Sequence, residues 1–159
     1  MIDIINFEYK GKNNFGFSYF HTFKDFAIIV SKDDFSNRKA VESRNVDILL
    51  SPEKGRGKDF MHFRDSGLNH VLCALAHKNN VTIGFNFREV LKGNNRSLIL
   101  GKMMQNVRLC RKYKVRMAVI YVAHDENELK SARDLFSFAL VIGMTPAEAK
   151  IALNFGKEK

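Results

Sequence analysis

The stretch that most constrains the fold is residues 64–116, where helix-like and strand-like patterns alternate. Apolar positions at helical spacing give way to the strand-like residues 81–87, and a longer helical segment follows. Strands that alternate with helices predict βαβ units, whose strands are parallel and whose helices cover the sheet. The apolar residues 27–30 agree with this, since strands apolar on both faces are typical of covered parallel sheets. We therefore expect an α/β fold with a mostly parallel sheet.

Helix ends are marked by side chains that cap exposed backbone groups. Ser36 can cap a helix over 37–44, and Asp65 or Ser66 can cap the next one. After Gly143, which suits a helix end, a capping box with proline at the first helical position starts the last helix. Its residues are Thr145, Pro146 and Glu148. The sequence thus predicts strands over 27–30, 46–50, 81–87 and 117–122, and helices over 37–44, 97–113, 131–142 and 146–154.

Two helices show an apolar stripe at the spacing of one helix face. The stripe of the helix before residue 81 is Leu68, Val71, Leu72 and Leu75. The stripe of the helix over 97–113 is Leu100, Met103, Met104, Val107 and Cys110. We expect both stripes to be buried. Cys73 and Cys110 each lie between apolar neighbours in a helix, so buried free thiols are expected rather than a disulfide.

Residues 1–26 are dense in phenylalanine, and strands are conceivable over 1–7 and 15–19. Aromatic rings beside basic residues could stack on nucleobases, but core packing is the favoured interpretation for a small domain. The start of the chain lacks the order of a signal peptide, and no run of 18 apolar residues exists. A cytoplasmic protein without a membrane span is expected.

Positive charge is concentrated in one segment. Residues 88–116 hold nine Lys or Arg and one acid, Glu89, whereas the rest of the chain holds 17 basic and 16 acidic residues. A basic excess this local suggests a surface that faces RNA or DNA, although a solvated helix face gives the same pattern. The loop over 52–63 adds Gly55 and Gly57 around Arg56; it is no P-loop, and both phosphate contact and a plain surface turn remain open.

Several blocks in order resemble a known family. They are NRKAVESRNVDILLSPE, RDSGLNHVLCALAHKNNVTIGFNF, GKMMQNVRLCRKYKV and RDLFSFALVIGMTPAEAK. Together they resemble the archaeal and eukaryotic ribonuclease P protein component 3 family, over residues 27–155. The resemblance implies a TIM-barrel-like fold and a non-catalytic subunit that supports the catalytic RNA in removing the 5′ leader of precursor tRNA. It also implies Mg²⁺ acting through the RNA, no cofactor in the protein, and pairing with component 2 as a heterotetramer.

The chain departs from the family pattern before residue 27, where members carry extra strand and helix units. We therefore expect a reduced or open barrel in one domain over 1–159. Its parts would be a reduced N-terminal part (1–26), a family-like region (27–155) and a tail (156–159). Self-association as a homodimer could cover exposed sheet edges.

RNA binding through phosphates needs cations on rigid elements. Arg88 is the first candidate and Arg64 the second, because loops after strands form the site face of barrel proteins. Arg133 has an alternative role, pairing with a core carboxylate. The candidate RNA-binding residues are Arg64, Arg88, Arg108, Arg111, Lys112, Lys114, Arg116 and Arg133.

The rival function is a stand-alone metal-dependent phosphoesterase of the related barrel superfamily. Such a site requires an HxH pair near the first strand, and none of the five histidines belongs to such a pair. His70 and His77 lie two turns apart on a helix, too far to share one metal. We therefore assign no catalytic and no metal-binding residue to this chain. A DNA-binding or ribosome-associated domain is a third possibility that charge alone does not separate.

Overall fold

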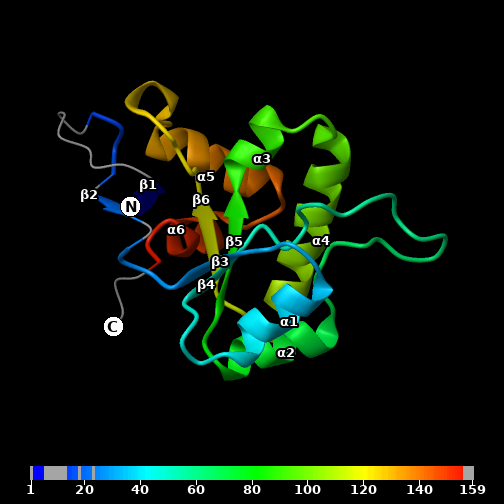
Figure 1. Ribbon diagram of the computed structural model, residues 1–159. Coiled ribbons are helices and arrows are strands. Elements are labelled where there is room, and N and C mark those ends of the chain that lie inside the picture. Colours follow the sequence, from blue (N-terminus) through cyan, green and yellow to red (C-terminus); the bar gives the residue numbers. More distant parts are fainter. Residues whose placement is uncertain (1, 6–13, 18, 23, 156–159) are drawn as a thin grey trace.

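The computed structural model describes residues 2–5, 14–17, 19–22 and 24–155 (Figure 1). Strands and helices alternate along most of it, as the sequence predicts. The strands are β1 (Ile2–Ile5), β2 (Tyr19–Thr22), β3 (Ile28–Val30), β4 (Ile48–Leu50), β5 (Thr82–Asn86) and β6 (Met117–Ile120). The helices are α1 (Asp34–Glu42), α2 (His70–Lys78), α3 (Phe87–Lys92), α4 (Arg96–Tyr113), α5 (Ala132–Val141) and α6 (Pro146–Ala152), with a 3₁₀ turn at Glu126–Glu128.

Four strands form one parallel sheet in the order β3-β4-β5-β6. The expected parallel α/β fold is therefore confirmed. Alternate residues of each strand point to opposite faces. On one face, Leu49, Ile83 and Val119 belong to the large core that the helices cover. On the other face, Ile48 and Ile120 belong to a second, smaller core.

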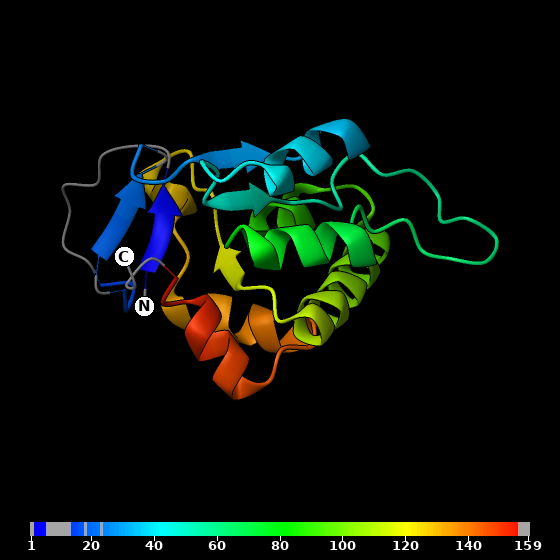
Figure 2. The same cartoon turned by 90° about the horizontal axis from the view of Figure 1, so that it is seen from below.

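The smaller core fills the inner side of an open, barrel-like sheet. Phe26, Ile28 and Phe155 pack onto it. The two-stranded parallel sheet of β1 and β2 continues the structure beyond β6, since β1 lies next to β6 (Figure 2). This arrangement is an open TIM-barrel-like fold rather than a closed eight-stranded one.

Two predicted helix caps are wrong. Asp33, not Ser36, caps α1, and Ser36 completes the capping box from the third helical position. Asn69, not Asp65 or Ser66, caps α2, because its side chain accepts a hydrogen bond from the amide of Leu72. Several residues at each helix start have short polar side chains, so the type of residue alone did not fix the position.

Both apolar stripes are confirmed in part, since Leu72 in α2 and Met103, Val107 and Cys110 in α4 are buried as predicted. In α2, Val71 is 45% exposed, while Cys73 and Ala76 are fully buried. In α4, Met104 is 37% exposed, while Lys102 (1%) and Asn106 (0%) are buried. The buried face of α4 is therefore rotated toward two polar residues, which bind the loop that follows β4.

The boundary between the last two helices agrees with the sequence, whereas α1 and α6 each end two residues earlier than predicted. Thr145 and Glu148 form the capping box of α6, with Pro146 at its start. Gly143 has φ +95° after α5, a backbone conformation that glycine adopts readily. Cys73 and Cys110 are buried free thiols, as expected.

The N-terminal predictions are partly borne out. A strand over 1–7 corresponds to β1, but residues 15–17 are not a strand, and β2 begins only at Tyr19. Phe17 is 6% exposed and belongs to the core, as predicted for these phenylalanines. The expected tail, 156–159, lies outside the described residues. In the described part of the chain, no helix has the length and apolar character needed to cross a membrane.

Candidate nucleic-acid interface

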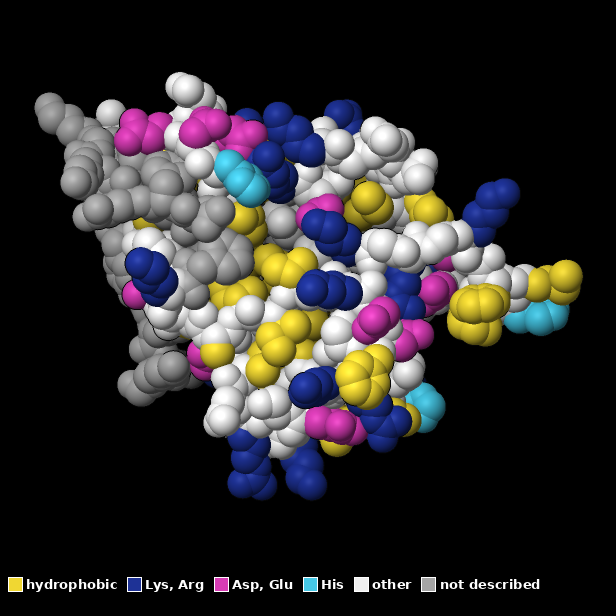
Figure 3. Space-filling model, viewed as in Figure 1, with side chains coloured by type: hydrophobic (Ala, Val, Ile, Leu, Met, Phe, Trp, Pro, Cys, Tyr) yellow, Lys and Arg dark blue, Asp and Glu magenta, His cyan; other side chains and the backbone are white. Residues whose placement is uncertain are grey.

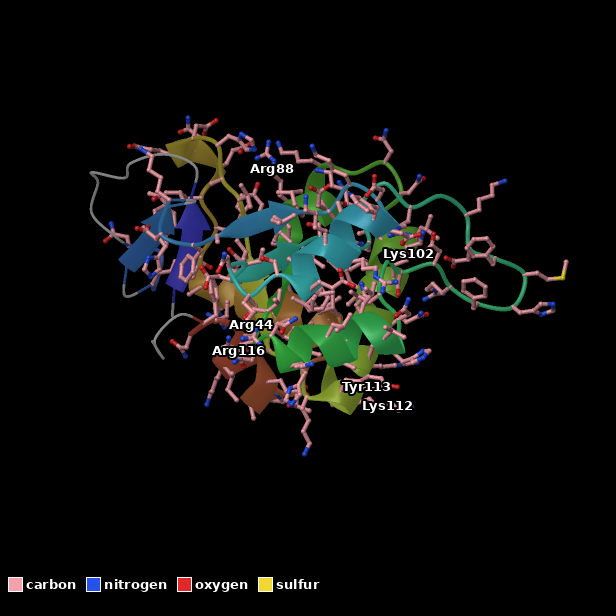
Figure 4. The ribbon with its side chains drawn as sticks, turned by 60° about the horizontal axis from the view of Figure 1, so that its bottom comes forward. Arg44, Arg88, Lys102, Lys112, Tyr113 and Arg116 are labelled. Carbon is pink, nitrogen blue, oxygen red and sulfur yellow. The ribbon has the colours of Figure 1, made fainter. Side chains whose placement is uncertain are left out.

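The parallel sheet separates the candidate cations into two groups. Arg88 follows β5 at the carboxyl end of the strands, whereas Arg116 precedes β6 at the amino end. Figure 4 places Arg88 far from Arg116 and Lys112. No single surface can therefore use all eight candidates at once.

Three candidates meet where α4 ends and β6 begins. Arg111, Lys114 and Arg116 line one pocket of about 270 Å³. Arg116 donates a hydrogen bond to the carbonyl of Asn80 (2.6 Å), which fixes it at this end of the sheet. Arg111 forms a two-pronged ion pair with Glu148 (2.8 and 2.7 Å) and lowers the pKa of that carboxyl to about 2. We call the group Arg108, Arg111, Lys112, Lys114 and Arg116 the basic end.

Within the described residues, Arg111 is the member of the basic end that forms an ion pair, and Arg116 is held by the carbonyl of Asn80. Arg108, Lys112 and Lys114 are its exposed cations whose side chains make neither an ion pair nor a hydrogen bond there. Arg108 and Lys112 are four residues apart, so they neighbour each other on one side of α4. Lys114 takes the left-handed conformation (φ 55°) that ends α4. Their charge is thus available to a polyanion, and Figure 3 shows Lys and Arg side chains projecting from this lower end of the molecule.

Two basic residues that the sequence analysis did not select lie at the same end. Arg44 follows α1, and Lys78 ends α2, each shortly before a strand of the sheet. Asn79 donates to the carbonyl of Val41 (2.8 Å), which holds these two helix ends together. Their position directly before a strand, like that of Arg116, was a usable signal once the sheet was taken to be parallel.

A groove of about 650 Å³ runs between α4 and the loop that precedes α2. Arg64 and Lys112 both line it, so it joins another candidate to the basic end. Arg64 lies against α4 at Gly101, where a Cβ would come within 2.5 Å of its guanidinium, and pairs with Asp59 (3.2 Å). The groove is lined by Asp34, Phe60, Phe63, Arg64, Asp65, Ser66, Gly67, Leu68, Asn69, His70, Gln105, Leu109, Lys112 and Tyr113.

The loop wall of this groove is fixed by buried polar contacts. Lys102 donates to the carbonyl of Gly57 (2.7 Å), and Asn106 donates to that of Ser66 (2.9 Å). Arg56, largely buried, pairs with both Asp34 and Asp65. The loop is therefore tied to α1 and α4 by these contacts. The choice between phosphate contact and a plain surface turn stays open for the exposed tip of the loop.

Arg88, the first candidate, is engaged within the protein. Its guanidinium pairs with Glu128, which also accepts from the amide of His124 (3.1 Å) and lies 3.6 Å from Lys92. The hydrogen bond from Arg88 is the main cause that lowers the pKa of Glu128 to about 2. Its charge is compensated, so on physical grounds it ranks below the unpaired cations of the basic end.

Arg133 is exposed on α5 and pairs with no carboxylate among the described residues, so its alternative role at a core carboxylate is wrong. The neighbouring Asp134 instead completes the capping box of α5 with Ser131. Arg133 lies on a different helix from the basic end and is not brought together with it.

The described residues contain no group of three or more His, Cys, Asp or Glu side chains that could hold a metal ion. His77 shares a hydrogen bond between its Nδ1 and the carbonyl of Lys114 (2.9 Å), whereas His70 lines the groove. The two histidines thus have separate surroundings.

Fold and site together define a parallel α/β protein with an open barrel-like sheet and a basic end suited to a polyanion. Residues 18–155 match the family model described as RNase P subunit p30. The chain belongs to this family. The resemblance inferred from the sequence is thereby confirmed.

Relatives of known sequence agree. The chain is 38% identical over 121 residues to ribonuclease P protein component 3 of Thermococcus kodakarensis, covering 75% of this chain and 51% of that protein. It is 36% identical over 124 residues to the same component of Methanococcoides burtonii, covering 77% and 48%. The chain thus spans about half the length of the curated relatives it matches.

Solved structures support the fold. A chain in a cryo-EM structure of archaeal ribonuclease P with mature tRNA has a TM-score of 0.76 at 23% identity, covering 97% of this chain and 87% of that one. A crystal structure of an uncharacterized protein has a TM-score of 0.52 at 11% identity, covering 80% and 31%. At these identities the likeness concerns the fold alone.

Proposed function

We propose that this chain is a non-catalytic protein subunit of ribonuclease P that binds and supports the catalytic RNA in removing the 5′ leader from precursor tRNA. Membership in the RNase P subunit p30 family over residues 18–155 carries the proposal. The unpaired cations Arg108, Lys112 and Lys114 give it a physical basis, because phosphate contacts through Lys and Arg dominate affinity for nucleic acids.

The same proposal names the partners and the metal. Ribonuclease P RNA is the direct partner and precursor tRNA an indirect one. Component 2 is the expected protein partner, in a heterotetramer with two copies of each, and a homodimer is the alternative assembly. Mg²⁺ acts through the RNA, and the complex works in the cytoplasm.

Reconstitution tests this function. The purified protein is combined with the cognate ribonuclease P RNA and component 2, and precursor-tRNA cleavage is measured at moderate Mg²⁺. We expect cleavage to rise when this protein is added, and to fall for Lys112→Ala combined with Lys114→Ala. The control is Lys24→Ala combined with Lys39→Ala, which removes the same charge from exposed positions elsewhere. No gain from the wild-type protein, together with no salt-dependent RNA binding, would refute the proposal.

A further inference from the structure

Apolar side chains are exposed to solvent at the tip of the loop that forms one wall of the groove. Phe60, Met61 and Phe63 are 58%, 92% and 62% exposed. The two rings stack on each other, with centroids 4.5 Å apart and planes inclined by 24°. Figure 3 shows hydrophobic and histidine side chains together at this projecting tip. Exposed apolar groups of this size mark a contact surface.

The two walls of the groove differ in chemistry. The loop wall carries the rings of Phe60 and Phe63, whereas the α4 wall carries Lys112 and Tyr113. Arg108 lies three residues from Gln105 and four from Lys112, both of which line the groove, so it flanks the same wall. Aromatic platforms opposite unpaired cations are the pattern of single-strand nucleic-acid sites, in which bases stack and phosphates meet positive charge.

We propose that this groove binds unpaired nucleotides of RNA. Bases stack on the exposed faces of Phe60 and Phe63, and the adjoining phosphates contact Lys112 and Arg108. The inference rests on the proposed function and deepens it, since it assigns single-stranded rather than duplex RNA to this part of the surface.

Two features favour this occupant over duplex RNA or a protein. Bases within a duplex are covered by their neighbours, so only unpaired bases offer a face to a ring. The apolar tip is also framed by cations: Lys58 lies two residues before Phe60 and Lys112 lies across the groove, whereas Arg64, which follows the tip, is paired with Asp59. A basic frame around aromatic rings complements a polyanion with flat apolar bases.

The test is fluorescence anisotropy with a labelled oligouridylate and, separately, a labelled RNA duplex of similar charge. The variant Phe60→Leu/Phe63→Leu keeps the apolar character and removes the rings; Phe60→Tyr/Phe63→Tyr keeps the rings. Phe35→Leu is the matched control, because Phe35 is 76% exposed and does not line the groove. We expect the leucine variant to bind oligouridylate about tenfold more weakly or worse. The tyrosine variant, the control variant and duplex binding should stay near wild type.

The outcomes separate this inference from the proposed function. Unchanged oligouridylate binding by the leucine variant overturns the groove inference, while wild-type activity in reconstitution still supports the subunit function. If the leucine variant loses only its association with component 2, the tip is a protein contact and the inference is wrong. If the wild-type protein binds no RNA and gives no gain in cleavage, both fail together.

Discussion

Glu53 holds its proton at neutral pH. The carboxyl group is 2% exposed, its Oε1 has no hydrogen-bond partner, and Asn106 is 3.4 Å from the other oxygen. Burial raises the pKa from the ordinary value of 4.5 to about 8. Between these two values the unfolded chain ionises Glu53 while the folded protein does not. The free energy of unfolding therefore falls as pH rises through this window, by up to about 1.4 kcal/mol per pH unit.

Replacing Glu53 with Gln should remove this cost, because the amide carries no charge and still accepts from Asn106. We expect the variant to gain stability relative to the wild-type protein as pH rises from about 5 to about 8, with little further change above that. Urea unfolding of both proteins across this range measures the difference. A constant difference between the two curves would show that Glu53 does not hold its proton in the folded state.

The ion pair of Arg88 and Glu128 should give stability the opposite dependence on pH, because its contribution is lost in acid. Since the pKa of Glu128 is lowered to about 2, the pair stabilises the protein above about pH 4.5, and this stabilisation is lost as pH falls toward 2. Arg88→Ala should lower the melting temperature at pH 7, and the gap to the wild-type protein should close in acid. Arg133→Ala, which removes an exposed arginine, is the control and should leave the melting temperature unchanged. A gap that persists at about pH 2 would mean that Arg88 acts through packing instead.

At the scale of secondary-structure elements, α4 shows which features can be predicted from the sequence and which cannot. Its length and place were predictable from periodicity, but its buried face was not. Lys102 and Asn106 are buried because their side chains donate to carbonyls of the loop after β4, 45 and 40 residues away along the chain. Periodicity assigns polar residues to solvent, and no local pattern reports that a distant loop will supply acceptors. The groove beside α4 could not be predicted from the sequence for the same reason.

Strand β5 depends on a residue without a side chain. A Cβ on Gly84 would lie 2.9 Å from Leu50 Cδ1 and 3.0 Å from Ile48 Cγ2, on the inner face of the sheet. Gly84→Ala should therefore overpack the smaller core and cost about 1–3 kcal/mol of stability. Gly57→Ala is the matched control, since nothing lies within 4 Å of the added atom. Equal stability of the two variants in urea unfolding would show that the inner face has room to spare.

At the scale of the whole molecule, the sequence located the charge but not which charges are free. The excess over residues 88–116 did predict a basic surface, and its C-terminal half forms one. Arg88 was ranked first from its place after a strand, yet its partner Glu128 lies 40 residues away. Ion pairs at such a distance depend on the packing of the 3₁₀ turn against α3, which a linear pattern does not contain. The sheet then places the free cations at the opposite end.

Because those cations are held together, RNA binding should depend on salt through the basic end and not through net charge alone. Arg108→Ala/Lys112→Ala/Lys114→Ala removes three positive charges from a net +9. Each lost phosphate contact should flatten the dependence of log affinity on log salt by about one unit, so the slope should fall by about two to three units. Binding of the ribonuclease P RNA is measured by filter retention over a range of potassium chloride concentrations.

The control for this experiment is Lys24→Ala/Lys32→Ala/Lys39→Ala, which removes the same charge from exposed residues outside the basic end. If the field of the whole protein governed binding, both triple variants would flatten the slope alike. If the basic end contacts the phosphates, only the first variant flattens the slope. The reason is that counterions are released where a side chain neutralises a phosphate, and a distant charge does not release them. Equal slopes for the first variant and the wild-type protein would place the RNA on another surface.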